Sequence, residues 1–196
     1  MAEYSIRFDI DYPDRELDRL TTFFRPLAAI PIIIVFLMIA GSRWGASEGG
    51  LLFLGPLLMI VFRQKYPRWW FDWNVSLLRF ANRIGAYLAL LDDRYPATDD
   101  EQSIHLDIDY PAVKEDLNRW FPLIKWLLAI PHYIVLSLLY MAGAVAILLA
   151  WFSILITGRY PRSLFDFVVG VLRWNNRVVG YAFLLVTDQY PPFSLR

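Results

Sequence analysis

Two pairs of aspartates, each in the pattern Asp-x-Asp, are the residues whose type and spacing most directly suggest a binding site. Asp9 and Asp11 lie near the start of the chain, and Asp107 and Asp109 repeat the pattern near its middle. Alternate side chains of a strand share one face, so four carboxylates on paired strands could hold a hard cation such as Ca²⁺. The alternative, which we favour, is that these carboxylates form ion pairs with arginines or face water.

A stripe of arginines and aspartates recurs in the last long helical segment of each half of the chain. Its members are seven and four residues apart, which places them on one face of a helix. Guanidinium groups stay charged at any accessible pH and bind carboxylates or phosphates with two hydrogen bonds. We expect the arginines to pair with carboxylates of the protein or, equally, to contact anionic lipid headgroups. The stripe consists of Asp72, Arg79 and Arg83 in the first half and Asp166, Arg173 and Arg177 in the second.

His132 is a candidate metal ligand of another kind, because a histidine inside an apolar segment could coordinate a haem or chlorophyll metal. It has no counterpart in the first half of the chain, where Ile32 occupies the matching position. We therefore favour a hydrogen bond within the helix bundle over metal coordination.

Composition places these residues in a membrane protein. Apolar residues make up 57% of the 196 residues and charged residues only 19%, and the apolar residues are gathered in blocks. The chain has no cysteine, which excludes disulfides, thiolate nucleophiles and cysteine zinc sites. Its formal net charge is zero, which argues against a nucleic-acid binder that relies on many phosphate contacts.

The apolar blocks predict four membrane passes. Residues 126–158 contain no charged residue, and as one helix they would reach about 50 Å, beyond a hydrocarbon core of about 30 Å. We therefore expect a helical hairpin there, as in the first half, where the loop-like residues 42–50 interrupt the apolar block. Only Arg43 of the 19 basic residues lies on the side of the hairpin tips, so both termini should be cytoplasmic. The expected passes are residues 26–41, 51–62, 126–140 and 144–157.

The chain is an internal duplication. The segment SIRFDIDYP at residues 5–13 returns as SIHLDIDYP at residues 103–111, and the similarity continues to the end of both halves. We therefore divide the chain into repeat 1 (residues 1–96), a linker (97–102) and repeat 2 (103–196), and expect the two repeats to form one structural domain.

Each repeat should begin with a strand, because apolar and polar residues alternate in its first segment. A juxtamembrane helix, residues 14–24 or 112–121, should follow each strand. Since both repeats enter and leave the membrane on the same side, they should be parallel repeats related by a pseudo-two-fold axis along the membrane normal. Strands that lie across such an axis run antiparallel, so residues 5–12 and 103–110 should pair with each other.

The end of the chain resembles a known family. FDFVVGVLRWNNRVVGYAFLLVTDQYPPF at residues 165–193, preceded by GRYPR at residues 158–162, is similar to a bacterial membrane-protein family catalogued as a domain of unknown function. The likeness covers nearly the whole chain and is greater in the second half, since Trp69, Trp70 and Trp73 depart from the pattern. The resemblance implies a small protein of the bacterial cytoplasmic (inner) membrane with this two-fold layout, and it implies no reaction or cofactor.

The predicted fold class is a mainly α integral membrane protein. It has two parallel pseudo-symmetric repeats, each with a short β-strand, a juxtamembrane helix, a transmembrane helical hairpin and an amphipathic helix. No catalytic group or cofactor motif is recognisable, so we expect a non-enzymatic scaffold or accessory subunit that binds lipids and either other membrane proteins or a second copy of itself. The alternative is a small transporter or channel whose path the Arg/Asp stripes line, although the four passes contain almost no polar residue.

Overall fold

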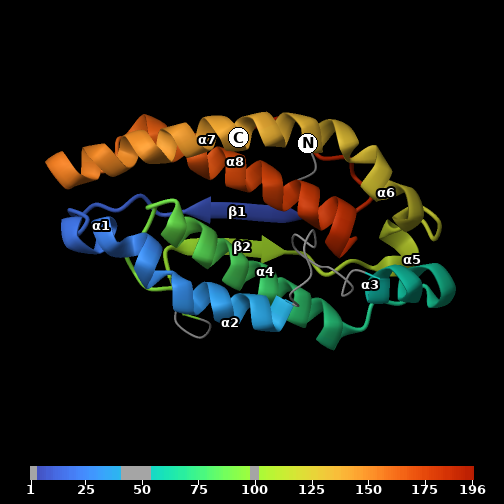
Figure 1. Ribbon diagram of the computed structural model, residues 1–196. Helices are drawn as coiled ribbons and strands as arrows, with labels where there is room; N and C mark the ends of the chain where they lie inside the picture. Colours follow the sequence, from blue (N-terminus) through green and yellow to red (C-terminus); the bar gives the residue numbers. More distant parts are fainter. Residues whose placement is uncertain (1–3, 41–53, 98–101) are drawn as a thin grey trace.

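The axes of two strands and of the longer helices are roughly aligned, and these elements build the protein in layers (Figure 1). The computed structural model describes residues 4–40, 54–97 and 102–196. The strands are β1 (Ile6–Ile10) and β2 (Ile104–Ile108). The longer helices are α1 (Arg19–Ala28), α2 (Ile30–Ala40), α4 (Arg68–Leu88), α7 (Ile130–Thr157) and α8 (Arg162–Val179). The shorter elements are α3 (Leu54–Leu58), α5 (Val113–Asp116), α6 (Pro122–Leu128) and the π-helical turns η2 (Met59–Arg63) and η3 (Gly180–Leu184).

The predicted antiparallel pairing of the two strands is confirmed. Phe8 lies opposite Leu106, its own counterpart in the repeat, and Ile6 and Ile10 lie opposite Ile108 and Ile104. The apolar side chains of β1 are buried while its charged side chains are exposed. The sheet therefore has one face toward the helices and one charged face on the outside.

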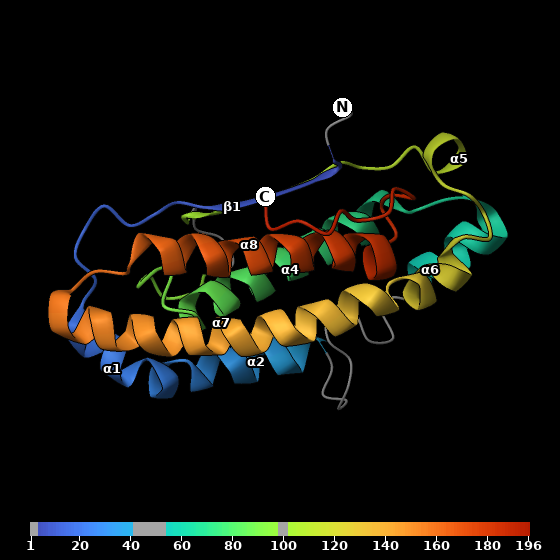
Figure 2. The ribbon, with the colours of Figure 1, turned by 90° about the horizontal axis from the view of Figure 1, so that it is seen from above.

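Three layers follow from the packing of these elements. Strand β1 packs on α8 and β2 packs on α4, while α8 in turn contacts α7 and α4 contacts α2. Figure 2 shows the strands on one side, α4 and α8 in the middle, and α7 with α1 and α2 on the opposite side. We call these the strand layer, the middle layer and the outer layer. The middle layer thus has protein on both sides, which is why its helices α4 and α8 bury many apolar residues.

The hairpin predicted within residues 126–157 is wrong. From Ile130 to Thr157 the chain forms one helix, α7, of 28 residues. No charged residue interrupts the segment, and its one proline, Pro131, lies in the first turn of α7. Ala146, Ala150 and Ile154 are buried along the helix, so continuous packing outweighs the helix cost of Gly143. The helix ends at Gly158, whose φ of 74° is in the left-handed region that glycine adopts easily.

The two passes predicted in repeat 1 also differ from the structure. Most of the first pass forms α2, which is bent by 41° from α1. Residues 42–50, the predicted loop, lie outside the described residues. From residue 54 the second pass forms α3 and η2, ten residues in all, and a helix of that length reaches only about 15 Å.

Helix length and composition now limit the number of membrane spans. Among the described residues, α7 is the one helix long and apolar enough to cross a bilayer, and the bent pair α1–α2 would be a second if it counted as one span. The four passes that we predicted are therefore not present as such, although α7 points to association with a membrane.

The helices predicted directly after the strands are shorter than expected. Helix α1 begins only at Arg19, because the Asp18 carboxylate caps it by accepting hydrogen bonds from the backbone N–H groups of Leu20 and Thr21 at 2.7 and 3.1 Å. In repeat 2 the corresponding region contains only α5, with four residues. An extended connection, rather than a juxtamembrane helix, leads from each strand to the next helix.

Two buried asparagines join the helices of the middle layer. Asn82 on α4 and Asn176 on α8 are counterparts in the repeat, and the Nδ2 of each donates to the Oδ1 of the other at 2.8 Å. We expect Asn82→Leu to lower the free energy of unfolding by about 2 kcal/mol, because the amide of Asn176 then stays buried without its partner. Changing both residues to leucine should cost less than the single change. Denaturant unfolding in one detergent, followed by circular dichroism, measures both, and a double variant less stable than the single variant would contradict the argument.

Candidate functional site

Each of the four aspartates predicted as a binding group lies beside a basic side chain on the exposed face of the strand layer. The Oδ1 of Asp9 lies 2.7 Å from an Nη of Arg173, and Asp107 lies 3.7 Å from Arg79. Two further partners were not foreseen, since Asp109 pairs with Arg7 at 3.0 Å and Asp11 with His105 at 2.9 Å. The pairing that we favoured is thus present, and the described residues contain no group of three His, Cys, Asp or Glu arranged to hold a metal ion.

The stripe arginines tie the middle layer to the backbone of the strands. The Nε of Arg173 donates to the carbonyl oxygen of Phe8 at 2.8 Å, and the Nε of Arg79 donates to that of Leu106 at 2.9 Å. The two contacts are alike, and each joins one half of the chain to the strand of the other half. Charged donors on carbonyl groups form strong hydrogen bonds, so Arg79 and Arg173 hold the strands against α4 and α8.

The other members of the stripe have different neighbours. Arg83 donates to the carbonyl oxygen of Ala97, and Arg177 donates to that of Ser194 at 3.3 Å. Asp72 and Asp166 do not contact these arginines but pair with the residue four positions earlier, Arg68 at 3.1 Å and Arg162 at 3.0 Å. The stripe is therefore divided into an exposed ion pair at each helix start and two arginines further along that contact other segments.

Two buried cations were missed by the sequence analysis. Arg25 and Lys125 are almost fully buried. Arg25 donates to the carbonyl oxygens of Tyr87 and Asp92 at 3.1 and 2.7 Å. Lys125 donates to that of Thr187 at 2.8 Å and forms an ion pair with Asp188 at 2.7 Å. Arg25 thus joins α1 to the end of α4 and the residues after it, and Lys125 joins α6 to the residues after η3.

Burial and a nearby carboxylate have opposite effects on Lys125. Desolvation lowers the pKa of Lys125 below its ordinary value, and the Asp188 carboxylate opposes that shift. The signal that could have identified both cations is their position in the repeat, because a basic residue stands five positions before Ile30-Pro31 and before Ile130-Pro131. Repetition of a charged residue at the edge of an apolar segment indicates a structural partner.

His132 forms the internal hydrogen bond that we favoured. Its Nδ1 accepts from the indole Nε1 of Trp174 at 3.0 Å, and its ring stacks on Phe193 with ring centres 4.1 Å apart. The ring is buried at the start of α7. It therefore helps to hold the end of the chain against α7 and α8.

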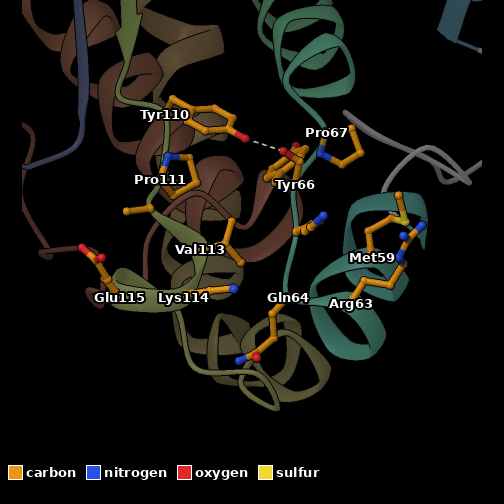
Figure 3. A pocket seen from close by; sticks show the side chains of 12 residues that line it. Met59, Arg63, Gln64, Tyr66, Pro67, Tyr110, Pro111, Val113, Lys114 and Glu115 are labelled. Atoms are coloured by element: carbon orange, nitrogen blue, oxygen red, sulfur yellow. Dashed lines mark hydrogen bonds between the residues drawn. The ribbon is translucent and has the colours of Figure 1, made fainter.

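One cavity has a basic lining at the turn between η2 and α4 (Figure 3). Its volume is about 540 Å³, and Arg63, Lys65 and Lys114 contribute charge to it, with Glu115 as the acidic residue. Tyr110 lines this cavity, and its hydroxyl donates a hydrogen bond to the carbonyl oxygen of Tyr66. These flexible basic side chains attract anions in general and do not form a defined binding site.

A second cavity combines two arginines of the stripe with apolar side chains. It lies between α2 and α4, has a volume of about 320 Å³, and we call it the α2–α4 cavity. Arg79 and Arg83 supply its charge. The remaining lining residues are Ile39, Trp73, Ser76, Leu77 and Phe80. Paired guanidinium groups beside an apolar wall suit a ligand with an anionic head and an apolar tail, so this cavity is the candidate functional site.

Comparison with known proteins locates one recognisable domain. No curated protein and no solved structure matches the chain. The family match covers α6, α7, α8 and the segment after them, so it falls in repeat 2, where the resemblance in the sequence was also greater. Residues 120–194 match the model of the family DUF4389, a domain of unknown function.

Proposed function

We propose that the protein is a non-enzymatic membrane protein of the bacterial cytoplasmic (inner) membrane, acting as a scaffold or accessory subunit that binds lipids and other membrane proteins. The observation that carries this proposal is the apolar surface of the outer layer. Met38 on α2 and Met141 on α7 are 78% and 69% exposed, and many large apolar side chains of α1, α2, α6 and α7 are exposed with them. So many exposed large apolar side chains on the helices of one layer mark contact with a membrane or with another protein.

The opposite side of the molecule supports an orientation in which α7 lies along the membrane. The segment that contains β1, residues 4–12, is connected by hydrogen bonds to residues near both ends of α7. At one end, the Tyr4 hydroxyl donates a hydrogen bond to the carbonyl oxygen of Gln189, and the hydroxyl of the adjacent Tyr190 donates to that of Leu128, just before α7. At the other end, the Tyr12 hydroxyl donates to the carbonyl oxygen of Tyr160, just after α7. If α7 crossed the bilayer upright, the charged strand face would cross it too, at about 2.5–3.5 kcal/mol for each charge at the centre.

We therefore replace the four-pass arrangement with an in-plane one. The outer layer lies in the lipid and the strand layer faces water, with the middle layer between them (Figure 2). Strand β1 and the C-terminal end of the chain both lie on the side of the strand layer. In this orientation we propose that the water-facing side is the cytoplasmic one, so that both termini are cytoplasmic.

Contacts between the repeats support a pseudo-two-fold arrangement of repeat 1 and repeat 2 within one domain. Tyr12 donates to the carbonyl oxygen of Tyr160, and its counterpart Tyr110 donates to that of Tyr66. The reciprocal contacts of Arg79 and Arg173 obey the same relation. A pseudo-two-fold axis would pass through the Phe8–Leu106 pair of the strand layer and the Asn82–Asn176 pair of the middle layer, and so across the layers toward the membrane in this orientation. Because each repeat supplies partners to the other, neither is complete alone.

A flotation experiment tests the membrane proposal. The purified chain should float with phosphatidylcholine vesicles and stay bound after an alkaline wash. Met141→Glu places a charge in the middle of the outer layer and should release most of the protein, because a buried charge costs several kcal/mol in lipid. Gln189→Glu makes the same charge change at an exposed residue on the other side and should leave flotation unchanged. A wild-type chain that stays in solution would refute the proposal.

The transporter remains the alternative function. In the described residues the stripe arginines contact strand carbonyls, Ala97 and Ser194 rather than facing each other across a path. A scaffold predicts that liposomes containing the wild-type chain show no more ion or solute flux than empty liposomes. Flux that depends on the protein would replace the scaffold proposal with the transporter.

A further inference from the structure

In repeat 2 the chain's own C-terminal tail, residues 193–196, covers the stripe arginines. An Nη of Arg173 donates to the carbonyl oxygen of Leu195 at 3.1 Å, and Arg177 donates to that of Ser194 at 3.3 Å. The side chain of Leu195 packs against the apolar cluster that contains Trp174. The two arginines therefore hold a segment that presents oxygen acceptors and an apolar group together.

The same positions of repeat 1 line the α2–α4 cavity. Arg79, Phe80 and Arg83 are the counterparts of Arg173, Trp174 and Arg177, each 94 residues earlier. Ile39 on α2 likewise corresponds to Leu139, which belongs to the cluster under the tail. The side chain of Arg79 is 46% exposed, against 23% for Arg173. The two repeats thus build one site twice, and in repeat 2 the tail shows which chemistry the site accepts.

A peptide cannot occupy the site of repeat 1 in the way that the tail occupies repeat 2. The tail passes so close to Gly170 that a Cβ there would lie 2.9 Å from the Leu195 Cβ and carbonyl oxygen. Repeat 1 has Ser76 at this position, and its Cβ blocks that approach. The occupant must place its oxygens at the arginines and still leave room beside Ser76, as a narrow acyl chain does.

The charges of the cavity favour an anion. Arg79 and Arg83 each use one N–H group on a backbone carbonyl, of Leu106 and Ala97. The nearest carboxylate to Arg79, that of Asp107, is 3.7 Å away, whereas Asp9 approaches Arg173 to 2.7 Å. Within residues 4–40, 54–97 and 102–196, the two guanidinium groups have one loosely held carboxylate beside them, which leaves a positive charge and N–H donors for a phosphate.

We propose that the α2–α4 cavity binds one anionic phospholipid. Its phosphate lies between Arg79 and Arg83, and one acyl chain lies along Ile39, Leu77 and Phe80. The cavity lies between α2 of the outer layer and α4 of the middle layer, and in the orientation proposed above this is the boundary between lipid and water where phospholipid headgroups lie. This inference rests on the proposed membrane function and names the lipid class and its site.

Lipid retention measured by native mass spectrometry tests this site. The chain is reconstituted in nanodiscs of phosphatidylcholine and phosphatidylglycerol, and the bound lipids are counted after release. The wild type should retain one phosphatidylglycerol in preference to phosphatidylcholine. Changing Arg79 and Arg83 together to glutamine should weaken retention about tenfold, because charge-assisted hydrogen bonds are lost. Ser76→Phe fills the cavity and keeps both arginines, so it should weaken retention equally even if the first variant folds poorly.

Controls separate this inference from simpler explanations. Arg68→Gln with Arg162→Gln removes two exposed arginines of the ion pairs at the helix starts and should not change retention. Millimolar inorganic phosphate should not displace the lipid, because phosphate lacks the acyl chain. Equal retention of both lipids by the wild type, displacement by phosphate, or unchanged retention in Ser76→Phe would overturn the site. Any of these results with normal flotation would leave the proposed membrane function standing.

Discussion

Replacing Lys125 with alanine is expected to lower the free energy of unfolding by about 3–5 kcal/mol, the cost of removing one partner of a buried ion pair. The side chain of Lys125 is fully buried, and its ammonium group contacts both the Thr187 carbonyl oxygen and the Asp188 carboxylate. Without it, the carbonyl oxygen loses its donor and a cavity opens between α6 and the end of η3. Denaturant unfolding of the purified chain in one detergent measures the difference.

The exposed Lys114 supplies the matched control, because Lys114→Ala removes the same charge from an exposed position on α5 and should change stability by less than about 0.5 kcal/mol. The loss in Lys125→Ala should also depend on pH. Burial lowers the pKa of Lys125 in the folded state, so between that pKa and 10.5 the unfolded state binds more protons and the wild type gains stability as pH rises. Equal losses of unfolding free energy in Lys125→Ala and Lys114→Ala would refute the structural role of Lys125.

Labels at the two ends and the centre of α7 are expected to lie at the same depth in a bilayer. The chain has no cysteine, so Ile130→Cys, Met141→Cys and Ile156→Cys each create one site for a fluorescent label. All three residues are exposed on the outer layer. Quenching by lipids that carry a spin label at known depths should place the three fluorophores within about 5 Å of one another, because an in-plane helix keeps a constant depth.

An upright α7 predicts a different pattern of quenching. Met141 and Ile156 are fifteen residues apart, about 22 Å along a helix axis, so Met141 would lie near the bilayer centre and Ile156 near an interface. The aqueous control is His105→Cys on the strand face, which should react with a membrane-impermeant thiol reagent. A 20 Å difference in depth between labels at Met141 and Ile156 would restore a membrane-crossing helix.

Features encoded by local periodicity were predictable from the sequence. The alternation of Ile6, Phe8 and Ile10 with charged residues indicates a strand with one buried face, and its repetition indicates the antiparallel partner. The spacing of Arg79 from Asp72, and of Arg173 from Asp166, placed each arginine on the polar face of its own helix, from which it reaches the strand layer. The ion pairs of Asp72 and Asp166 also follow from the sequence, because residues four positions apart are neighbours on a helix.

The course of α7 was not predictable from hydropathy. A long uncharged segment has the same composition whether it forms a hairpin or one helix, and the choice depends on what it packs against. The buried Ala146, Ala150 and Ile154 allow α7 to lie along the middle layer over its whole length. The mean hydropathy of the segment therefore indicated contact with lipid but not the direction in which the helix runs through it.

The sequence by itself determined the two strands and the residue types that pair across the layers, since each depends on patterns within about ten residues. Only the tertiary structure decided that Lys125 is buried and that the tail covers Arg173 while Arg79 lines a cavity. Those outcomes depend on segments far apart in the chain, such as Lys125 and Thr187, 62 residues apart. Burial is a property of whatever covers a side chain, and two identical local patterns differ in exposure as soon as one of them is covered.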